Sequence, residues 1–116
     1  MEQSTVEEIM DRASELGRLI QDTDIYRTFI ELSGFLKDDE SASKLLDEYE
    51  ERLREIDERQ RAGDIIESYE MESLREISMD VQNHGLIMEF LAAKKEYISL
   101  LERIQQSLIK DSSEKE

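Results

Sequence analysis

The chain has 116 residues, of which 38% are hydrophobic and 39% are charged, and its formal net charge at pH 7 is −15. Its length indicates one domain, and its charge would repel phosphate backbones and anionic lipid surfaces over about 10 Å. The absence of cysteine excludes disulfides, thiolate catalysis and cysteine-ligated metal clusters within the chain. We therefore expect no direct nucleic-acid binding, and an acidic surface that favours partner proteins with basic patches.

The sequence carries no segment typical of membrane targeting. Its first residues, Met1 to Ser4, are acidic and polar, unlike a secretory signal. No apolar run approaches the roughly 20 residues that a membrane-spanning helix needs. These features predict a cytoplasmic protein with no membrane association.

The pattern of residues predicts an all-α fold. The chain has no proline and only four glycines, so long uninterrupted helices are permitted, and no segment alternates with the period of a strand. A first helix is expected over residues 5–21, where one apolar stripe recurs at helical spacing. Gly17 lies inside it and costs about 1 kcal/mol relative to alanine, which we attribute to close approach of another helix. The stripe comprises Val6, Ile9, Ala13, Leu16 and Ile20.

A second helix is predicted over residues 24–37 and a third over residues 40–62. The run from Asp22 to Asp24 supplies side-chain oxygens suited to a helix N-cap, and further acidic residues precede the third helix, where they suit its positive end. The third helix carries a heptad seam typical of coiled coils, and Gly63 fits its C-terminus. This seam comprises Ala42, Leu46, Tyr49, Leu53, Ile56 and Gln60.

Two further helices are predicted over residues 68–81 and from Asn83, a suitable cap, to about Ile109. The last helix carries a second heptad seam that includes one lysine, and polar seam positions can fix helix register. Residues 110–116 form an acidic tail that we expect to fray, and the whole chain, residues 1–116, is expected to be one helical domain. The second seam comprises Ile87, Phe90, Lys94, Tyr97, Leu101, Ile104 and Leu108.

No group of residues predicts a catalytic or metal site. A helical di-iron site needs two Glu-x-x-His motifs, whereas the chain has one histidine, His84, which we interpret as a turn residue. The motifs of serine hydrolases and phosphate-binding loops are absent. Phe35 and Tyr69 fit the apolar stripes least well, so each either packs on a neighbouring helix or anchors a partner protein. We expect no enzymatic activity, no cofactor and no small-molecule substrate.

A string of spaced residues runs through the chain in three segments. The first is Ala13, Glu15, Leu16, Gly17, Ile20, Thr23, Tyr26 and Phe29, the second is Leu36, Asp38, Ala42, Leu45 and Leu46, and the third is Asn83, Ile87, Phe90, Leu91, Ala93, Glu96, Tyr97, Leu100, Leu101 and Ile104. In this order and with these separations, the string resembles the YlbF/YmcA family of small bacterial regulators. The resemblance covers residues 9–108.

The resemblance implies a long α-helical hairpin flanked by shorter helices, usually dimeric, with the third and fifth helices as the hairpin. It also implies a non-enzymatic regulator linked to competence, sporulation or biofilm formation. Some members of the family act in a complex that modulates an endoribonuclease and messenger-RNA processing, so family paralogues or such a complex are expected partners. Members of that complex can carry cysteine-ligated iron–sulfur clusters, a property this cysteine-free chain does not share.

Our leading hypothesis is therefore a cytoplasmic, homodimeric regulator or adaptor that recognises partner proteins through its helix surfaces. The two heptad seams are the predicted interface of a dimeric helical bundle, although the same residues could close a core within one chain. An alternative of a different class is a small acidic holdase-type chaperone, which would bind many clients weakly. The predicted interface residues are Leu46, Tyr49, Leu53, Ile56, Phe90, Tyr97 and Leu101.

Overall fold

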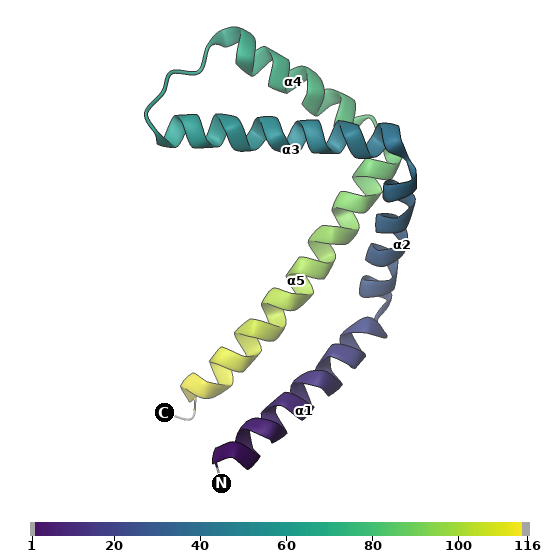
Figure 1. Ribbon diagram of the computed structural model, residues 1–116, viewed down its shortest axis with the longest axis vertical. Coiled ribbons are helices and arrows are strands. Elements are labelled where there is room, and N and C mark those ends of the chain that lie inside the picture. Colours follow the sequence, from purple (N-terminus) through teal and green to yellow (C-terminus); the bar gives the residue numbers. More distant parts are fainter. Residues whose placement is uncertain (1, 115–116) are drawn as a thin grey trace. The chain divides into compact units, whose positions relative to one another are not determined.

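The computed structural model describes residues 2–114, with side chains from residue 5 to residue 110. This part of the chain contains α-helices and no strand, which confirms the predicted all-α fold of about five helices (Figure 1). The helices are α1 (Glu2–Gln21), α2 (Asp24–Asp38), α3 (Glu40–Arg61), α4 (Ser68–Gln82) and α5 (Gly85–Glu114).

Side-chain caps begin the second and third helices, as the sequence predicts. The Thr23 hydroxyl accepts a hydrogen bond from the backbone N–H of Tyr26 at 3.1 Å, and the Asp39 carboxylate accepts one from the N–H of Ala42 at 3.0 Å. These oxygens satisfy backbone donors that have no partner within the first turn of a helix. Helix α3 ends where Gly63 adopts a positive φ of 85°, a conformation that glycine reaches without steric cost. The predicted start and end signals of these helices are therefore confirmed.

The start of α5 differs from the prediction. Asn83 does not cap α5 but ends α4, where its backbone N–H donates to the Met79 carbonyl at 3.0 Å. The residue before α5 is His84, whose Nδ1 lies 3.5 Å from the backbone nitrogen of Ile87. Because the turn is so short, His84 stands directly before α5 and three residues before Ile87, whose N–H has no carbonyl acceptor within the helix. The single histidine is therefore part of a helix start.

The last helix is longer than the sequence suggests. We expected α5 to end near Ile109, yet it continues to Glu114. No glycine or proline follows Ile109 to stop the helix. Of the tail expected to fray, residues 115 and 116 lie outside the described part of the chain.

The chain divides into two compact units, which are described separately. One unit comprises residues 32–92, and the other joins the chain up to residue 31 with the chain from residue 93 onward. In the unit of residues 32–92, α3 and α4 pack along each other as a hairpin (Figure 1). The resemblance had implied a hairpin of α3 with α5. The connection between α3 and α4 is only six residues long, and a short connection makes consecutive helices antiparallel neighbours.

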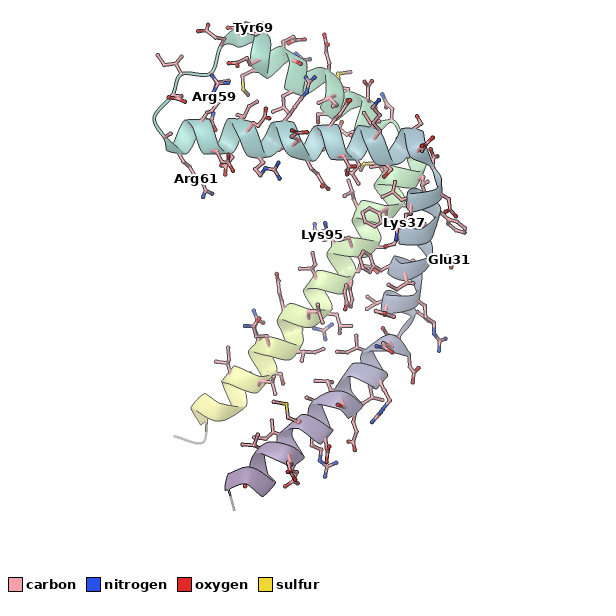
Figure 2. The ribbon with its side chains drawn as sticks, in the orientation of Figure 1. Glu31, Lys37, Arg59, Arg61, Tyr69 and Lys95 are labelled. Atoms are coloured by element: carbon pink, nitrogen blue, oxygen red, sulfur yellow. The ribbon has the colours of Figure 1, made fainter. Side chains whose placement is uncertain are left out.

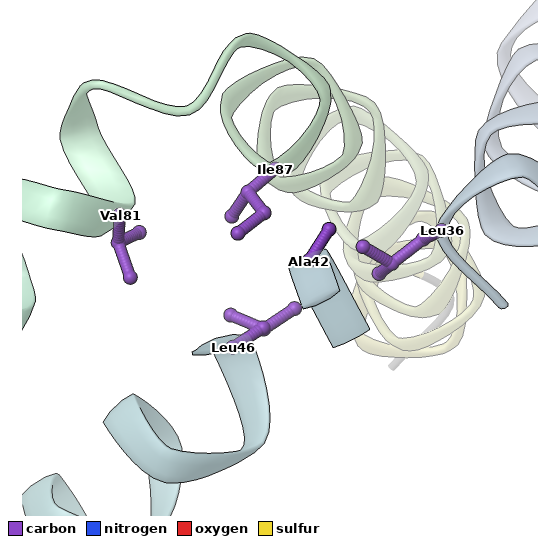
Figure 3. Close-up of a cluster of buried hydrophobic side chains, with 5 residues drawn as sticks. All are labelled: Leu36, Ala42, Leu46, Val81 and Ile87. Carbon is purple, nitrogen blue, oxygen red and sulfur yellow. The ribbon is translucent and has the colours of Figure 1, made fainter. Parts of the chain in front are cut away.

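A small apolar cluster forms the core of the unit of residues 32–92 (Figure 3). It joins the end of α2, the start of α3, the end of α4 and the start of α5. Ala42 and Ile87 are both 0% exposed, so the smallest and one of the larger aliphatic side chains share its centre. The cluster comprises Leu36, Ala42, Leu46, Val81 and Ile87, and the half-buried Leu45, Tyr49, Leu86, Phe90 and Leu91 pack around it.

The other unit has fewer buried residues. Ala93 is the only buried side chain in its described part, and three aromatic rings hold α2 to α5. The Tyr97 ring lies 5.1 Å from the Phe29 ring and 5.6 Å from the Tyr26 ring, measured between centroids. Such aromatic pairs contribute about 0.5–1.5 kcal/mol each beyond their burial. A single layer of helices buries only one stripe of each helix, so other apolar side chains of α1 and α5 remain exposed.

We predict that Ile87→Ala lowers the free energy of unfolding by about 2–5 kcal/mol, because it leaves a cavity among side chains that have no access to solvent. Ile65→Ala is the matched control: this side chain is 82% exposed, and its truncation should change stability by less than about 0.5 kcal/mol. Urea unfolding monitored by circular dichroism measures both values. Equal effects of the two substitutions would contradict the assigned core.

Candidate protein-interaction surfaces

The predicted interface residues fall into two groups. Leu46 is buried in the core, and Tyr49 and Phe90 pack against it, while Tyr97 contacts two rings of its own chain. The side chains of this first group are thus engaged within the chain. For these four residues, the structure agrees with the alternative given above, in which the seams close a core within one chain.

The other members of the seams remain more accessible. Leu53 and Leu101 are 40% and 39% exposed, and Ile56 is half-buried beside the hairpin pocket described below. Leu53 belongs to the unit of residues 32–92 and Leu101 to the other unit. Their contact with a second chain stays a prediction.

An arginine holds the loop at the end of the α3–α4 hairpin. Arg59 donates from Nη1 to Glu70 Oε1 at 2.5 Å and from Nη2 to the Ile65 carbonyl at 3.3 Å, and its Nε lies 4.0 Å from Asp64 Oδ2. Figure 2 places Arg59 and Tyr69 at this end of the hairpin. Because a guanidinium offers several donors in a fixed plane, one side chain fixes the loop from α3 and ties it to α4.

The Arg59 partner on α4 also caps that helix. The Glu70 carboxylate accepts a hydrogen bond from the Glu67 backbone N–H at 2.9 Å, as part of a capping box. The pKa of Glu70 is lowered, first by the hydrogen bond from Arg59 and then by the one from Glu67, and the same contact raises the pKa of Arg59. One carboxylate therefore both begins α4 and secures the loop.

The end of the hairpin carries two of the most exposed apolar side chains of the described chain, one in the loop and one in the first turn of α4. Ile65 is 82% exposed and Tyr69 is 74% exposed. Beside Tyr69 lies a pocket of about 320 Å³, where Arg52 of α3 contacts Ser73 of α4. Of the two aromatic residues singled out by the sequence, Phe35 is also exposed, at 53%. Both aromatic side chains are therefore largely exposed within their own chain, and their role as anchors for a partner stays a prediction. The surface formed by the loop, Ile65 and Tyr69 is called the hairpin tip below.

A second hollow lies in the other unit, between α1 and α5. This groove has a volume of about 430 Å³, and its walls are mostly apolar. Ile9 of α1 and Leu108 of α5, which face it, are 59% and 65% exposed. An ion pair between Arg12 and Glu15 at 3.3 Å stands at its border. Thr5, Glu8 and Arg12 add polar groups to its walls.

Two kinds of site are absent from the described residues. No group of three or more histidine or acidic side chains there could hold a metal ion. In the same part of the chain, no helix has an apolar stretch long enough to cross a membrane.

Sequence reasoning missed Arg59 and Ile65. Arg59 lies among many charged residues of α3, and its contact with a residue eleven positions later depends on how the loop turns back. Gly63 was the one signal available, because a helix end followed by a short connection places the next helix alongside.

We predict that Glu70→Gln makes the protein less stable at neutral pH and removes part of the acid sensitivity of folding. Because the folded pKa of Glu70 lies below its ordinary value of 4.5, its carboxylate stabilises the fold above that pH, and the stabilisation is lost as the pH falls through the folded pKa. The difference in unfolding free energy between wild type and variant should be constant above about pH 5.5 and shrink below about pH 4.5. Urea unfolding between pH 3 and pH 7 measures it, with Glu76→Gln on the same helix as the control.

The fold and the sequence both match known proteins. A solved protein of unknown function from Bacillus stearothermophilus (DUF964) superimposes with a TM-score of 0.75 over 92% of this chain and 94% of that chain, at 17% identity. RicA of Bacillus subtilis, solved in complex with RicF, superimposes with a TM-score of 0.71 over 92% and 95% of the two chains, at 19% identity. These likenesses establish the fold.

Sequence relatives cover nearly the whole chain. A UPF0342 protein of Streptococcus pyogenes is 28% identical over 108 residues, which are 90% of this chain and 96% of that protein. A UPF0342 protein of Staphylococcus saprophyticus is 23% identical over 106 residues, or 91% and 93% of the two chains. The family model described as "Control of competence regulator ComK, YlbF/YmcA" matches residues 9–111. The chain therefore belongs to the YlbF/YmcA family.

Proposed function

We propose that the protein is a non-enzymatic cytoplasmic regulator that acts by binding other proteins. The family description names control of a competence regulator, and the similar chain RicA forms a complex with another protein. Partners of the same kind, namely family paralogues or a complex containing an endoribonuclease, fit this chain best. Competence, sporulation, biofilm formation and messenger-RNA processing are the pathways in which we expect it to act.

The hairpin tip is the observation that carries this proposal. Ile65 is exposed on the loop where Arg59 makes three contacts, and Tyr69 is exposed in the first turn of α4 directly after that loop. Tyrosine is among the residues that contribute most to binding energy at protein interfaces, and an exposed isoleucine beside it adds apolar area that a partner can bury. A loop already fixed in one conformation loses little entropy on binding. The tip is therefore suited to insert into a pocket of a partner protein.

Charge narrows the kind of partner. The net charge of −15 accelerates the approach of a protein with a basic surface and disfavours acidic partners. The charges around the hairpin tip are mixed, since Arg59 and Arg61 stand near Asp64 and Glu67. The overall charge thus steers the encounter, and the apolar tip holds the complex.

A holdase-type chaperone remains the second candidate. Its supporting observation is the number of exposed apolar side chains on α1 and α5, including Met10 and Leu108, which are 62% and 65% exposed. A holdase uses such surfaces for weak contact with many unfolded clients. A regulator instead has one or two partners at fixed stoichiometry.

The deciding experiment is affinity capture of the tagged protein from the cytosol of its own cells, with mass spectrometry of the bound proteins. A few stoichiometric partners that include a family paralogue or an endoribonuclease would support the regulator. A broad and substoichiometric set of clients, enriched after heat shock, would support the holdase and contradict the regulator.

We predict that the double variant Ile65→Ser, Tyr69→Ser loses its stoichiometric partners while its thermal unfolding midpoint stays within a few degrees of wild type. Replacing two exposed anchors should weaken a specific interface at least about tenfold, and neither side chain supports the core. Met79→Ser is the matched control, because Met79 of α4 is exposed but lies away from the tip. Unchanged capture by the double variant would exclude the tip as the binding surface.

A further inference from the structure

Helix α1 has an apolar face that its own chain covers only in part. Val6, Met10, Ala13 and Gly17 follow each other at steps of four, three and four residues, which places them within an arc of about 60° on the helix. Val6 and Met10 are 52% and 62% exposed, Ala13 is exposed at the edge of the groove beside α5, and Gly17 is half-buried. We call these four residues the free face of α1.

Gly17 has no role within the part of the chain that the structure describes. We expected another helix to approach closely here, but a Cβ atom built on Gly17 would meet nothing within 4 Å. Glycine lowers the stability of a helix interior relative to alanine, and its φ lies in the ordinary helical range. A close approach from outside the chain would account for a residue that otherwise only destabilises α1.

We propose that a second copy of this chain covers the free face, with the two α1 helices antiparallel about a two-fold axis between Met10 and Ala13. In this register Val6 of one copy faces Gly17 of the other, and Met10 faces Ala13. Each large side chain then contacts a small one, and each of these two pairs occurs twice because the two-fold axis repeats it. The small residues let the helix axes approach, and the large ones fill the space between them.

The charges beside the free face favour a second copy over a basic partner. Glu7 and Arg18 lie on the same border of the face, and neither forms an ion pair among the described residues. In the antiparallel register, Glu7 of each copy stands beside Arg18 of the other, which gives two new ion pairs. Ser14 and Gln21, the residues nearest the face on this border, are uncharged. Two chains of net charge −15 can therefore meet here without like charges in contact, whereas a basic helix would face Arg18.

This inference rests on the self-association expected of the regulator and specifies the surface that carries it. The main test compares Gly17→Leu with Gly34→Leu by multi-angle light scattering and thermal unfolding of the full chain. Both glycines are helical and have open space around them, so both variants should stay folded, with a midpoint for Gly34→Leu no lower than wild type and a midpoint for Gly17→Leu lowered only by the loss of the second copy. Only the side chain added by Gly17→Leu would occupy the place of Val6 of the second copy. We expect a monomer for Gly17→Leu and a dimer for wild type and for Gly34→Leu.

A charge exchange tests the register. Glu7→Arg places two arginines side by side at both ends of the pair and should weaken the dimer about tenfold. The double variant Glu7→Arg, Arg18→Glu restores opposite charges and should recover the wild-type dissociation constant, measured by sedimentation equilibrium. Equal weakening by the single and double variants would overturn the antiparallel register.

These experiments distinguish two failures: the chain does not form a dimer, or it forms a dimer through a surface other than the free face of α1. A wild-type chain that is monomeric at all concentrations would exclude both, while leaving the binding of other proteins at the hairpin tip intact. A Gly17→Leu variant that keeps the dimeric mass would exclude the free face alone. If Leu53→Asp gives a folded monomer and Gly17→Leu does not, the α3 seam is the dimer contact.

Discussion

The packing of Ile87 against Ala42 is the contact on which the unit of residues 32–92 depends. Both side chains have no exposure, and they join the first turn of α5 to the first turn of α3. Alanine at this point lets the two helices approach, while isoleucine supplies the apolar area that holds them. Leu36, Leu46 and Val81 complete the cluster, so four helix ends are fixed by one small group. From this cluster α3 and α4 extend as a hairpin, whose far end is held separately by Arg59.

The limited core explains why so much apolar surface remains. A helix in a single layer buries one stripe, and a charged fraction of 39% supplies polar residues for the opposite side. Helix α1 has a wider apolar arc than one stripe requires: Leu16 and Ile20 are half-buried, while Val6 and Met10 remain exposed. The same holds at the hairpin tip, where Ile65 and Tyr69 are 82% and 74% exposed. Exposed apolar groups of this size, on ordered helices, are typical of proteins that function in complexes.

The sequence predicted what depends on neighbouring residues and failed where distant residues meet. Helices were found because their apolar periodicity and caps are local, and Thr23, Asp39 and Gly63 each act within four residues. The start of α5 was misplaced because Asn83 and His84 are both plausible caps, and only the turn geometry selects His84. The heptad seams indicated that α3 packs against another helix but not which one. The helix along α3 is α4, whereas the resemblance implied α5. Arg59 was missed because its carboxylate partner lies across a loop.

Gly17 illustrates how a failed prediction can still be informative. The sequence indicated that a helix interior would contain glycine only if something approached it closely, and the described chain places nothing there. The physical argument does not require the approaching helix to belong to the same molecule. The free face of α1 runs from the large Val6 and Met10 to the small Ala13 and Gly17, so two antiparallel copies place a large side chain opposite each small one, and Glu7 and Arg18 pair in the same way. A surface that is complementary to itself in both size and charge needs no other partner to explain it. The cost of the glycine to a single chain is then recovered when two chains meet.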